Sequence, residues 1–381
     1  MNIPFNKPHL AGRELYYIAQ AVLDGHISGN GEFTKRCHSF FEQRYGFRKT
    51  LLTSSCTDAL EMCAILLDIR PGDEVIMPSF TFVSTALAFI RQGAVIKFAD
   101  SRSDRPGVDE DKIEALISDK TKAIVVVHYA GISCDMEKIL ALKEKYKLAI
   151  VEDSAQAIET EYKGHQVGGI GDLGVFSFHE TKNIQCGEGG LLVVNSEKYL
   201  KRAEIIWEKG TNRAEFFRGE VNKYGWVDVG SSFLPSDMSA AFLTAQLDEL
   251  DDLQERRIAI WNRYYSSLKK FADRGVIELP ATPEFSTNNG HIFYIIMKSL
   301  EERSWFIERC RERGISTVFH YQSLHKSEYY QDKHDGRELP NSDKYADRLV
   351  RLPLYFDLWG DELEFTIEVV SSVLELCHMG I

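Results

Sequence analysis

The stretch KAIVVVHYAGISCDMEKILALKEKYKLAIVED, residues 122–153, holds two apolar runs on either side of a segment with helical periodicity. The first run, KAIVVVHY, and the last, LAIVED, are nearly continuous in apolar residues, which is typical of strands covered on both faces. Between them, DMEKILALKEKY repeats its apolar residues at helical spacing. A strand, a helix and a second strand in this order predict a parallel βαβ unit.

The same alternation extends over residues 50–196. Five more strand candidates are TLLT near Leu51, DEVIMP before Ser79, AVIKFAD ending at Asp100, GVFSF ending at Phe178 and GLLVVN ending at Asn195. With the two strands above, they predict an α/β fold whose mostly parallel, seven-stranded sheet is covered by helices on both faces. Ligands of such sheets bind at the carboxyl ends of the strands, so the residues there are the first candidates for a site.

The second part of the chain has a different pattern. Residues 236–271 form a long amphipathic stretch that predicts two helices or one bent helix. From about Val276 onward, a strand candidate, HIFYIIMK, is mixed with helical segments. We therefore predict a large domain of residues 1–250, which includes an N-terminal arm, and a smaller α+β domain of residues 251–381.

Charge and composition exclude several classes of function. The formal net charge of −12 and the lack of any run of five Lys or Arg residues disfavour a nucleic-acid partner. The seven cysteines are scattered without a C-x-x-C pair, which argues against a zinc ribbon, and we expect no metal. Without an apolar leader or a membrane-spanning run, the sequence predicts a cytoplasmic protein with no membrane partner.

Polar residues stand where the predicted strands end. In TSSCTDALEM, residues 53–62, hydroxyl side chains end a strand and open a helix. Backbone N–H groups at such a helix start can bind a phosphate, although simple N-capping by Ser or Thr would explain the same residues. Asp153 in VEDSAQ could hold a protonated ring nitrogen, or it could cap the segment that follows.

Two further features are aromatic residues after a strand and a lysine beside glycines. Phe80 and Phe82 follow a strand, and one of them could stack on an aromatic cofactor or simply belong to the core. Lys182 lies in FSFHETKNIQCGEGG, residues 176–190, between apolar bulk and glycines that let the backbone approach closely. A phosphate site, a carboxylate, an aromatic ring and a lysine that can form an imine are what pyridoxal 5′-phosphate (PLP) requires.

These motifs resemble the DegT/DnrJ/EryC1/StrS family of PLP-dependent sugar aminotransferases, in the fold type I class of PLP enzymes. The resemblance covers nearly the whole chain and rests on SSCTDAL, PGDEVIMPSFTFVSTA, VVHYAG, VEDSAQ, FSFHETKN, GEGG, SDMSAA, FHYQSLH and RLPLYF. It implies that Lys182 binds the cofactor covalently and acts as the catalytic base. It also implies that Asp153 pairs with the pyridine nitrogen, that Gln156 lies near the phenolic oxygen, and that Phe82 stacks on the ring.

The resemblance also implies how the phosphate is held. It assigns this role to Thr57, to the neighbouring backbone of Cys56 and Asp58, and to Ser177. Many members add an asparagine from the partner subunit, and Ser232 stands at that place here. A site shared in this way implies a homodimer.

The segments IPFNKP, FHETKN, EKGTNR and FFRG resemble the branch of the family that aminates C4 of dTDP-4-keto-6-deoxyglucose with L-glutamate. The expected products are dTDP-4-amino-4,6-dideoxygalactose, a precursor for cell-surface polysaccharide, and 2-oxoglutarate. The candidates for binding the substrate are His179, Lys209, Arg213, His320 and His325.

Several alternatives remain open at this point. The C4 epimer of the product, a 3-keto sugar, or a GDP- or UDP-linked sugar would leave the same motifs. Family members that are dehydratases carry histidine at the lysine position, so Lys182 favours transamination. A non-catalytic regulatory protein should have lost Lys182 or Asp153, and the G-x-G-x-x-G expected of a Rossmann oxidoreductase is missing from the predicted strand–helix turns.

Overall fold

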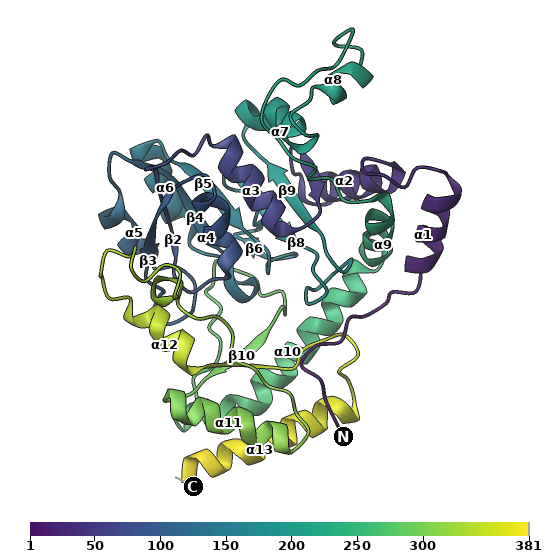
Figure 1. Ribbon diagram of the computed structural model, residues 1–381. Helices are drawn as coiled ribbons and strands as arrows, with labels where there is room; N and C mark the ends of the chain where they lie inside the picture. Colours follow the sequence, from purple (N-terminus) through teal and green to yellow (C-terminus); the bar gives the residue numbers. More distant parts are fainter. Residues whose placement is uncertain (380–381) are drawn as a thin grey trace.

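A seven-stranded sheet forms the centre of the large domain in the computed structural model, which describes residues 1–379 (Figure 1). Its strand order is β1-β9-β8-β5-β4-β2-β3. The strands are β1 (Thr50–Thr53), β2 (Glu74–Pro78), β3 (Val95–Ala99), β4 (Thr121–Val127), β5 (Ala149–Asp153), β8 (Leu173–Ser177) and β9 (Gly190–Val194). Strand β9 runs antiparallel to both of its neighbours, whereas the pairs from β8 to β3 are parallel. The predicted seven-stranded, mostly parallel sheet is confirmed.

Helices cover both faces of this sheet because successive strand residues point to opposite sides. In β4, Val125 faces one core together with the helices α3 (Cys56–Leu66), α4 (Val83–Ile90) and α7 (Leu200–Trp207). Its neighbour Ile124 faces the other core, where α6 (Met136–Tyr146) packs. Near β1, β8 and β9, that second face is covered by α1 (Glu14–Leu23), α2 (Glu32–Tyr45) and α9 (Asp237–Asp248).

The C-terminal part forms a separate apolar core around a two-stranded antiparallel sheet, β10 (Phe293–Ile296) and β11 (Leu349–Leu352). Three helices pack on it, namely α10 (Leu250–Asp273), α11 (Leu300–Glu312) and α13 (Asp361–Met379). Of the two predictions for residues 236–271, two helices or one bent helix, the first is confirmed, since α9 and α10 are separated at Glu249. Ile3, from the start of the chain, is buried in this same core. The boundary between residues 250 and 251 stays a prediction.

The shorter elements connect these layers. They are α5 (Glu110–Ile113), α8 (Arg213–Phe217), α12 (Pro340–Arg348), the β6 (Glu161–Tyr162) and β7 (His165–Gln166) pair, and the 3-10 turns η1 (Glu114–Leu116), η2 (Tyr129–Gly131), η3 (Glu197–Tyr199) and η4 (Leu324–Lys326). Residues 209–232, which include α8, form a projection that extends beyond α7 and away from the body of the molecule (Figure 1).

Residues 1–379 contain no helix with the length and apolar character needed to cross a membrane. Among residues 1–377, whose side chains the structure describes, no cluster of His, Cys, Asp and Glu side chains is suited to hold a metal ion.

Candidate active site

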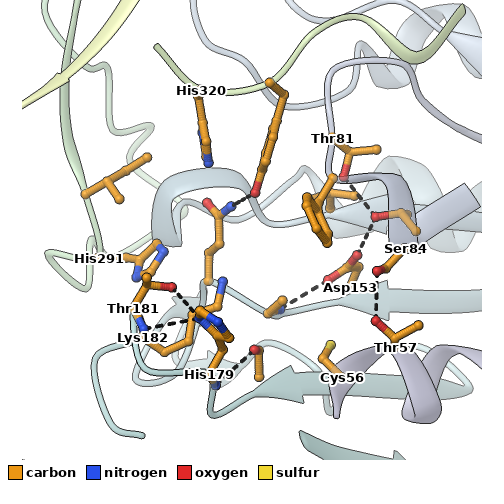
Figure 2. Close-up of a pocket in the computed structure, with 18 of the residues that line it drawn as sticks. Cys56, Thr57, Thr81, Ser84, Asp153, His179, Thr181, Lys182, His291 and His320 are labelled. Atoms are coloured by element: carbon orange, nitrogen blue, oxygen red, sulfur yellow. Dashed lines mark hydrogen bonds between the residues drawn. The ribbon is translucent and has the colours of Figure 1, made fainter. Parts of the chain in front are cut away.

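A cavity of about 580 Å³ opens at the carboxyl ends of the central strands, between the large domain and the C-terminal core (Figure 2). Nine of the residues singled out in the sequence line it, namely Cys56, Thr57, Phe82, Asp153, Gln156, Ser177, His179, Lys182 and His320. The topology brings them together because β1, β5 and β8 end at the same edge of the sheet.

Lys182 follows β8 in a turn that is closed by a hydrogen bond from its own N–H to the carbonyl of His179, at 2.9 Å. Its ammonium group has no hydrogen bond or ion pair with any residue whose side chain the structure describes. Burial lowers the pKa of Lys182, the charges of Cys56 and Asp153 oppose this effect, and Arg351 adds to it. A lowered pKa makes more of the neutral amine available, which is the form that attacks a carbonyl.

Asp153 is the last residue of β5, and its side chain is buried at the floor of the cavity. The Thr85 hydroxyl donates to its Oδ2 at 2.8 Å, and the Ala155 N–H donates to its Oδ1 at 3.2 Å. Burial raises the pKa of Asp153, while these two hydrogen bonds and the charge of Lys182 partly offset the increase. A buried carboxylate of this kind is stabilised by a cationic partner such as a protonated ring nitrogen.

The N-terminus of α3 forms one wall of the cavity and is suited to bind an anion. Ser55 caps the helix by accepting a hydrogen bond from the Asp58 N–H at 3.1 Å, so the Asp58 amide points into the cap and Asp58 does not line the cavity. The N–H groups of Cys56 and Thr57 precede the first intrahelical hydrogen bond and are free for a ligand. Gly190 in β9 lies against this turn, where a Cβ atom would come within 2.5 Å of the Cys56 nitrogen.

An aromatic and amide wall lies opposite the strand ends. The Ala130 N–H donates to Gln156 Oε1 at 2.7 Å, and Gln156 Nε2 donates to the Tyr321 hydroxyl at 2.9 Å. Tyr321 stacks on the ring of His320 with centroids 3.5 Å apart, and the Phe82 ring lies 6.0 Å from Tyr321. Burial places the pKa of His320 well below its usual value, so this imidazole is neutral at physiological pH.

His179 lies on the opposite rim of the cavity, close to Lys182 in the chain. Its Nδ1 is 3.0 Å from the Thr181 hydroxyl, and its Nε2 is 3.8 Å from a Glu188 carboxylate oxygen. The side chain is thus held by its own loop, with an edge turned to the cavity (Figure 2).

Besides Asp58, four of the expected binding residues do not line the cavity of their own chain. His325 is buried elsewhere, with its Nδ1 hydrogen-bonded to the Ser79 hydroxyl at 2.8 Å, so it packs against the end of β2 and does not face a substrate. Lys209, Arg213 and Ser232 belong to the projection of residues 209–232.

Sequence reasoning missed cavity residues that come from the C-terminal part and the N-terminal segment. They include Arg351 in β11, His291 just before β10, Tyr321 on the aromatic wall, and Phe5 and Asn6 near the N-terminus. The signals for Arg351 are its place as a charged residue in the apolar strand LVRL and its position at the start of the motif RLPLYF. Its proximity to Lys182 depends on tertiary packing and leaves no local pattern.

The residues that line this cavity fit PLP. Free N–H groups and the Ser177 hydroxyl suit a phosphate, buried Asp153 suits a ring nitrogen, and unpaired Lys182 suits an aldehyde. Because Gly190 has no Cβ atom, the start of α3 can lie directly beside β9, where the phosphate would bind.

Comparison with known proteins gives one consistent picture. The model of the DegT/DnrJ/EryC1/StrS aminotransferase family matches residues 10–372. The spore coat polysaccharide biosynthesis protein SpsC of Bacillus subtilis (strain 168) is 31% identical over 385 residues, which is 98% of this chain and 97% of that protein. The PLP form of the putative sugar aminotransferase Spr1654 from Streptococcus pneumoniae superposes with a TM-score of 0.90 at 28% identity, covering 99% of this chain and 100% of that one. The aminotransferase TlmJ from Streptoalloteichus hindustanus gives a TM-score of 0.90 at 27% identity, with the same two coverages of 99% and 100%.

Proposed function

The chain belongs to the DegT/DnrJ/EryC1/StrS aminotransferase family and is a PLP-dependent sugar aminotransferase, and we propose that it aminates C4 of a nucleotide-linked 4-keto-6-deoxy sugar. The proposed substrates are dTDP-4-keto-6-deoxyglucose and L-glutamate. The proposed products are dTDP-4-amino-4,6-dideoxygalactose and 2-oxoglutarate. The segments EKGTNR and FFRG, which resemble the branch with this activity, support the choice of sugar.

The observation that carries the proposal is that Lys182 and Asp153 lie in one cavity. Lys182 is unpaired and has a lowered pKa, and Asp153 is a buried carboxylate on the neighbouring strand end. A dehydratase or a non-catalytic protein has no need for an amine kept in this state. Transamination needs it twice, because one proton must be removed from the donor and another must be delivered to the sugar.

The residues of the cavity would each have a separate role in the reaction. The start of α3 and Ser177 would bind the cofactor phosphate, Phe82 would cover the ring, and Gln156 would face its phenolic oxygen. Asp153 would keep the ring nitrogen protonated. When bound, PLP supplies an electron sink for the negative charge that develops on the carbon losing its proton.

Lys182 performs the proton transfers in this proposal. With glutamate in the cavity, its amine takes the proton from the α-carbon of the donor as a general base. With the sugar in the cavity, the same side chain returns a proton to C4. The face of the sugar that meets Lys182 therefore decides whether the product has the galacto or the gluco configuration.

We further propose that the active enzyme is a homodimer with shared sites. Lys209, Arg213 and Ser232 lie on the projection and do not line the cavity of their own chain. The projection also exposes large apolar side chains, among them Phe217 at 69% and Trp226 at 85%. Burying them against a second copy would remove apolar surface from water and would bring the three polar residues to the partner's cavity.

The absorbance spectrum of the purified protein tests the reaction class. We expect a yellow enzyme whose absorbance bleaches with L-glutamate and returns with dTDP-4-keto-6-deoxyglucose, and a Lys182→Ala variant that gives neither change nor product. Wild-type turnover by that variant would refute the assignment of Lys182.

NMR of the product tests the sugar. An axial amino group at C4 is expected for the galacto product. An equatorial group would identify the gluco epimer, and conversion of only a 3-keto sugar or a GDP- or UDP-linked sugar would replace the proposed substrate.

A further inference from the structure

His325 and Ser79 form a buried hydrogen-bonded contact between the two parts of the chain, and no step of the proposed reaction uses it. Ser79 directly follows β2 in the large domain, and His325 belongs to the turn η4 in the C-terminal part. The two residues have exposed fractions of only 0% and 4%. Because neither one lines the active-site cavity, the contact has no direct part in holding a ligand there.

Three hydrogen bonds fasten Ser79 to this turn. The Leu324 N–H donates to the Ser79 carbonyl at 3.0 Å, and the His325 N–H donates to the Ser79 Oγ at 3.2 Å. The third bond joins the Ser79 hydroxyl and His325 Nδ1 at 2.8 Å. One bond would leave the two segments free to rotate about it, whereas three bonds in different directions fix both their distance and their orientation.

These bonds also assign the proton of the imidazole. The Ser79 Oγ accepts from the His325 N–H and has no further partner among residues 1–377, so its own proton is donated to Nδ1. The other ring nitrogen, Nε2, then carries a proton and faces the Asp343 Oδ1 in α12 at 3.6 Å. Burial lowers the pKa of His325, while the charge of Asp343 opposes this effect, so the ring is neutral at neutral pH.

Two walls of the active-site cavity begin at this contact. Phe80 and Phe82 come shortly after Ser79 in the chain, and Tyr321 comes shortly before η4. The Tyr321 ring lies 5.7 Å from that of Phe80 and 6.0 Å from that of Phe82. Phe82 and Tyr321 both line the cavity. The hydrogen bonds at Ser79 therefore join the two segments from which these rings project.

We infer that His325 is a positioning residue, which acts through Ser79 to hold Phe82 and Tyr321 at the separation that the cofactor ring needs. The inference rests on the proposed place of the PLP ring against Phe82, and it adds the contact that fixes this place. Stacking depends on the distance and tilt of the two rings, so a small movement of Phe82 would weaken it. Tyr321 would move with the same segment and would disturb Gln156, which donates to its hydroxyl.

Binding of PLP to the cofactor-free protein tests the inference. His325→Leu and Ser79→Ala both remove the bond between the two side chains, and each should raise the Kd for PLP roughly tenfold, as Phe82→Ala should. The double variant His325→Leu/Ser79→Ala should bind about as weakly as either single variant, because the same bond is lost only once. The visible circular dichroism of bound PLP, which reports the orientation of its ring, should fall in all of these variants.

His325→Asn separates the hydrogen bond from the imidazole ring. Its amide oxygen can accept from the Ser79 hydroxyl in place of Nδ1, so at pH 8 its Kd for PLP should lie within about twofold of the wild type. A protonated Nδ1 cannot accept this bond, so wild-type binding should weaken relative to His325→Asn below about pH 6.5 and match it at higher pH. The other charged groups around the ring, Lys326, His334 and Asp100, are the same in both proteins.

Tyr330→Phe is the matched control. The Tyr330 hydroxyl fastens the same segment to β3, since it accepts from the Ile96 N–H at 2.8 Å and donates to the Ile96 carbonyl at 3.1 Å, and it does not line the cavity. Tyr330→Phe and His325→Leu should both lower the midpoint of thermal unfolding. Only His325→Leu should change the Kd and the circular dichroism of PLP.

The outcomes separate the inference from the proposed place of the ring. Equal effects of Tyr330→Phe and His325→Leu on PLP, or a His325→Asn variant that binds PLP as weakly as His325→Leu, would overturn the role of His325. The same follows if Phe82→Ala weakens PLP binding while His325→Leu leaves it unchanged. If Phe82→Ala itself leaves the Kd and the circular dichroism of PLP unchanged, the proposed place of the cofactor ring is wrong, and the role of His325 is wrong with it.

Discussion

Lys182 shows how neighbouring charges prepare one side chain for its chemistry. Its pKa is lowered by burial and by Arg351, whereas Asp153 raises it. In the cofactor-free protein, Lys182 should therefore lose its proton at lower pH than a solvated lysine, whose pKa is near 10.4. Acetylation followed by peptide mass spectrometry across a pH series should find Lys182 reacting at lower pH than exposed lysines.

Two variants sharpen this prediction because they remove opposite charges. Asp153→Asn removes an anion, so the labelling midpoint of Lys182 should move to still lower pH. Arg351→Met removes a cation, so the midpoint should move to higher pH. Shifts in the same direction in both variants would contradict the electrostatic account and would indicate a change in solvent access.

The buried, ionised side chain of Asp153 should lower the stability of the cofactor-free protein. Its pKa is raised above the unfolded value, so the folded state resists ionisation and the cost is present at neutral pH. Asp153→Asn should therefore stabilise the cofactor-free protein by about 1–2 kcal/mol at pH 7. The gain should shrink as the pH falls through the folded pKa and should disappear below the unfolded one. Urea unfolding at several pH values measures this dependence.

The same variant should be a poor enzyme. Without the carboxylate the ring nitrogen has no anion to hold its proton, and turnover should fall at least roughly 100-fold. A variant that loses stability at pH 7, or that keeps full turnover, would contradict the role of Asp153.

Sequence reasoning identified residues that line the cavity where the determinants are local. Asp153 and Thr57 could be placed because each one follows an apolar strand and begins the next turn or helix. Arg351 and His291 could not, because they reach the cavity from the smaller sheet, and strand register says nothing about contacts with a distant domain. His325 has the spacing of a site residue in FHYQSLH, yet its ring points to Ser79, since the direction of a loop side chain depends on what packs around it.

At the scale of elements, the proposed phosphate site depends on three strands that meet the start of α3, since β1 and β8 end there and β9 begins there. Gly190 of β9 pairs with Thr53 of β1 on one side and with Ser177 of β8 on the other. This close arrangement needs a residue without a side chain, because a Cβ at Gly190 would lie 2.5 Å from the backbone of Ser55 and Cys56. The sequence GEGG suggested a close approach of the backbone, but the reversed direction of β9, which creates that approach, is a long-range feature of the sheet.

Gly190→Ala should therefore displace the first turn of α3. We expect a loss of about 1–3 kcal/mol of stability from overpacking, and we expect the Kd for PLP to rise at least about tenfold as the N–H groups lose their alignment. Thermal unfolding and cofactor titration of the cofactor-free protein give the two quantities.

Gly107→Ala is the control for this variant. Gly107 has no neighbour within 4 Å of an added Cβ and no positive φ, so both quantities should match the wild type. If Gly190→Ala binds PLP as tightly as this control does, the α3 start is not the phosphate site.

The whole molecule assembles its cavity from parts that are far apart in the chain. The central strands supply the chemistry, the smaller sheet supplies Arg351, and the N-terminal segment adds Phe5. The projection of residues 209–232 carries the remaining predicted contacts away from this cavity (Figure 1). A single chain thus holds nearly all of one site, and in the proposed homodimer its projection would reach the site of the other copy.

Mixed dimers test this arrangement. Lys182→Ala should inactivate a chain. The double variant Lys209→Ala/Arg213→Ala should impair turnover, because it removes two cations that we propose bind the diphosphate of the sugar nucleotide. If the projection acts on the partner, a dimer with one chain of each kind has one intact site, in which the normal Lys182 of the second chain meets the normal projection of the first. Coexpression with two affinity tags isolates this mixed dimer, and its turnover should be about half that of the wild type. If the projection acts on its own chain, neither site of the mixed dimer is intact, and its activity should stay at the level of the two variant homodimers.

Full activity of the Lys209→Ala/Arg213→Ala homodimer would show that neither residue belongs to the site. A monomer in light scattering would refute the shared arrangement altogether.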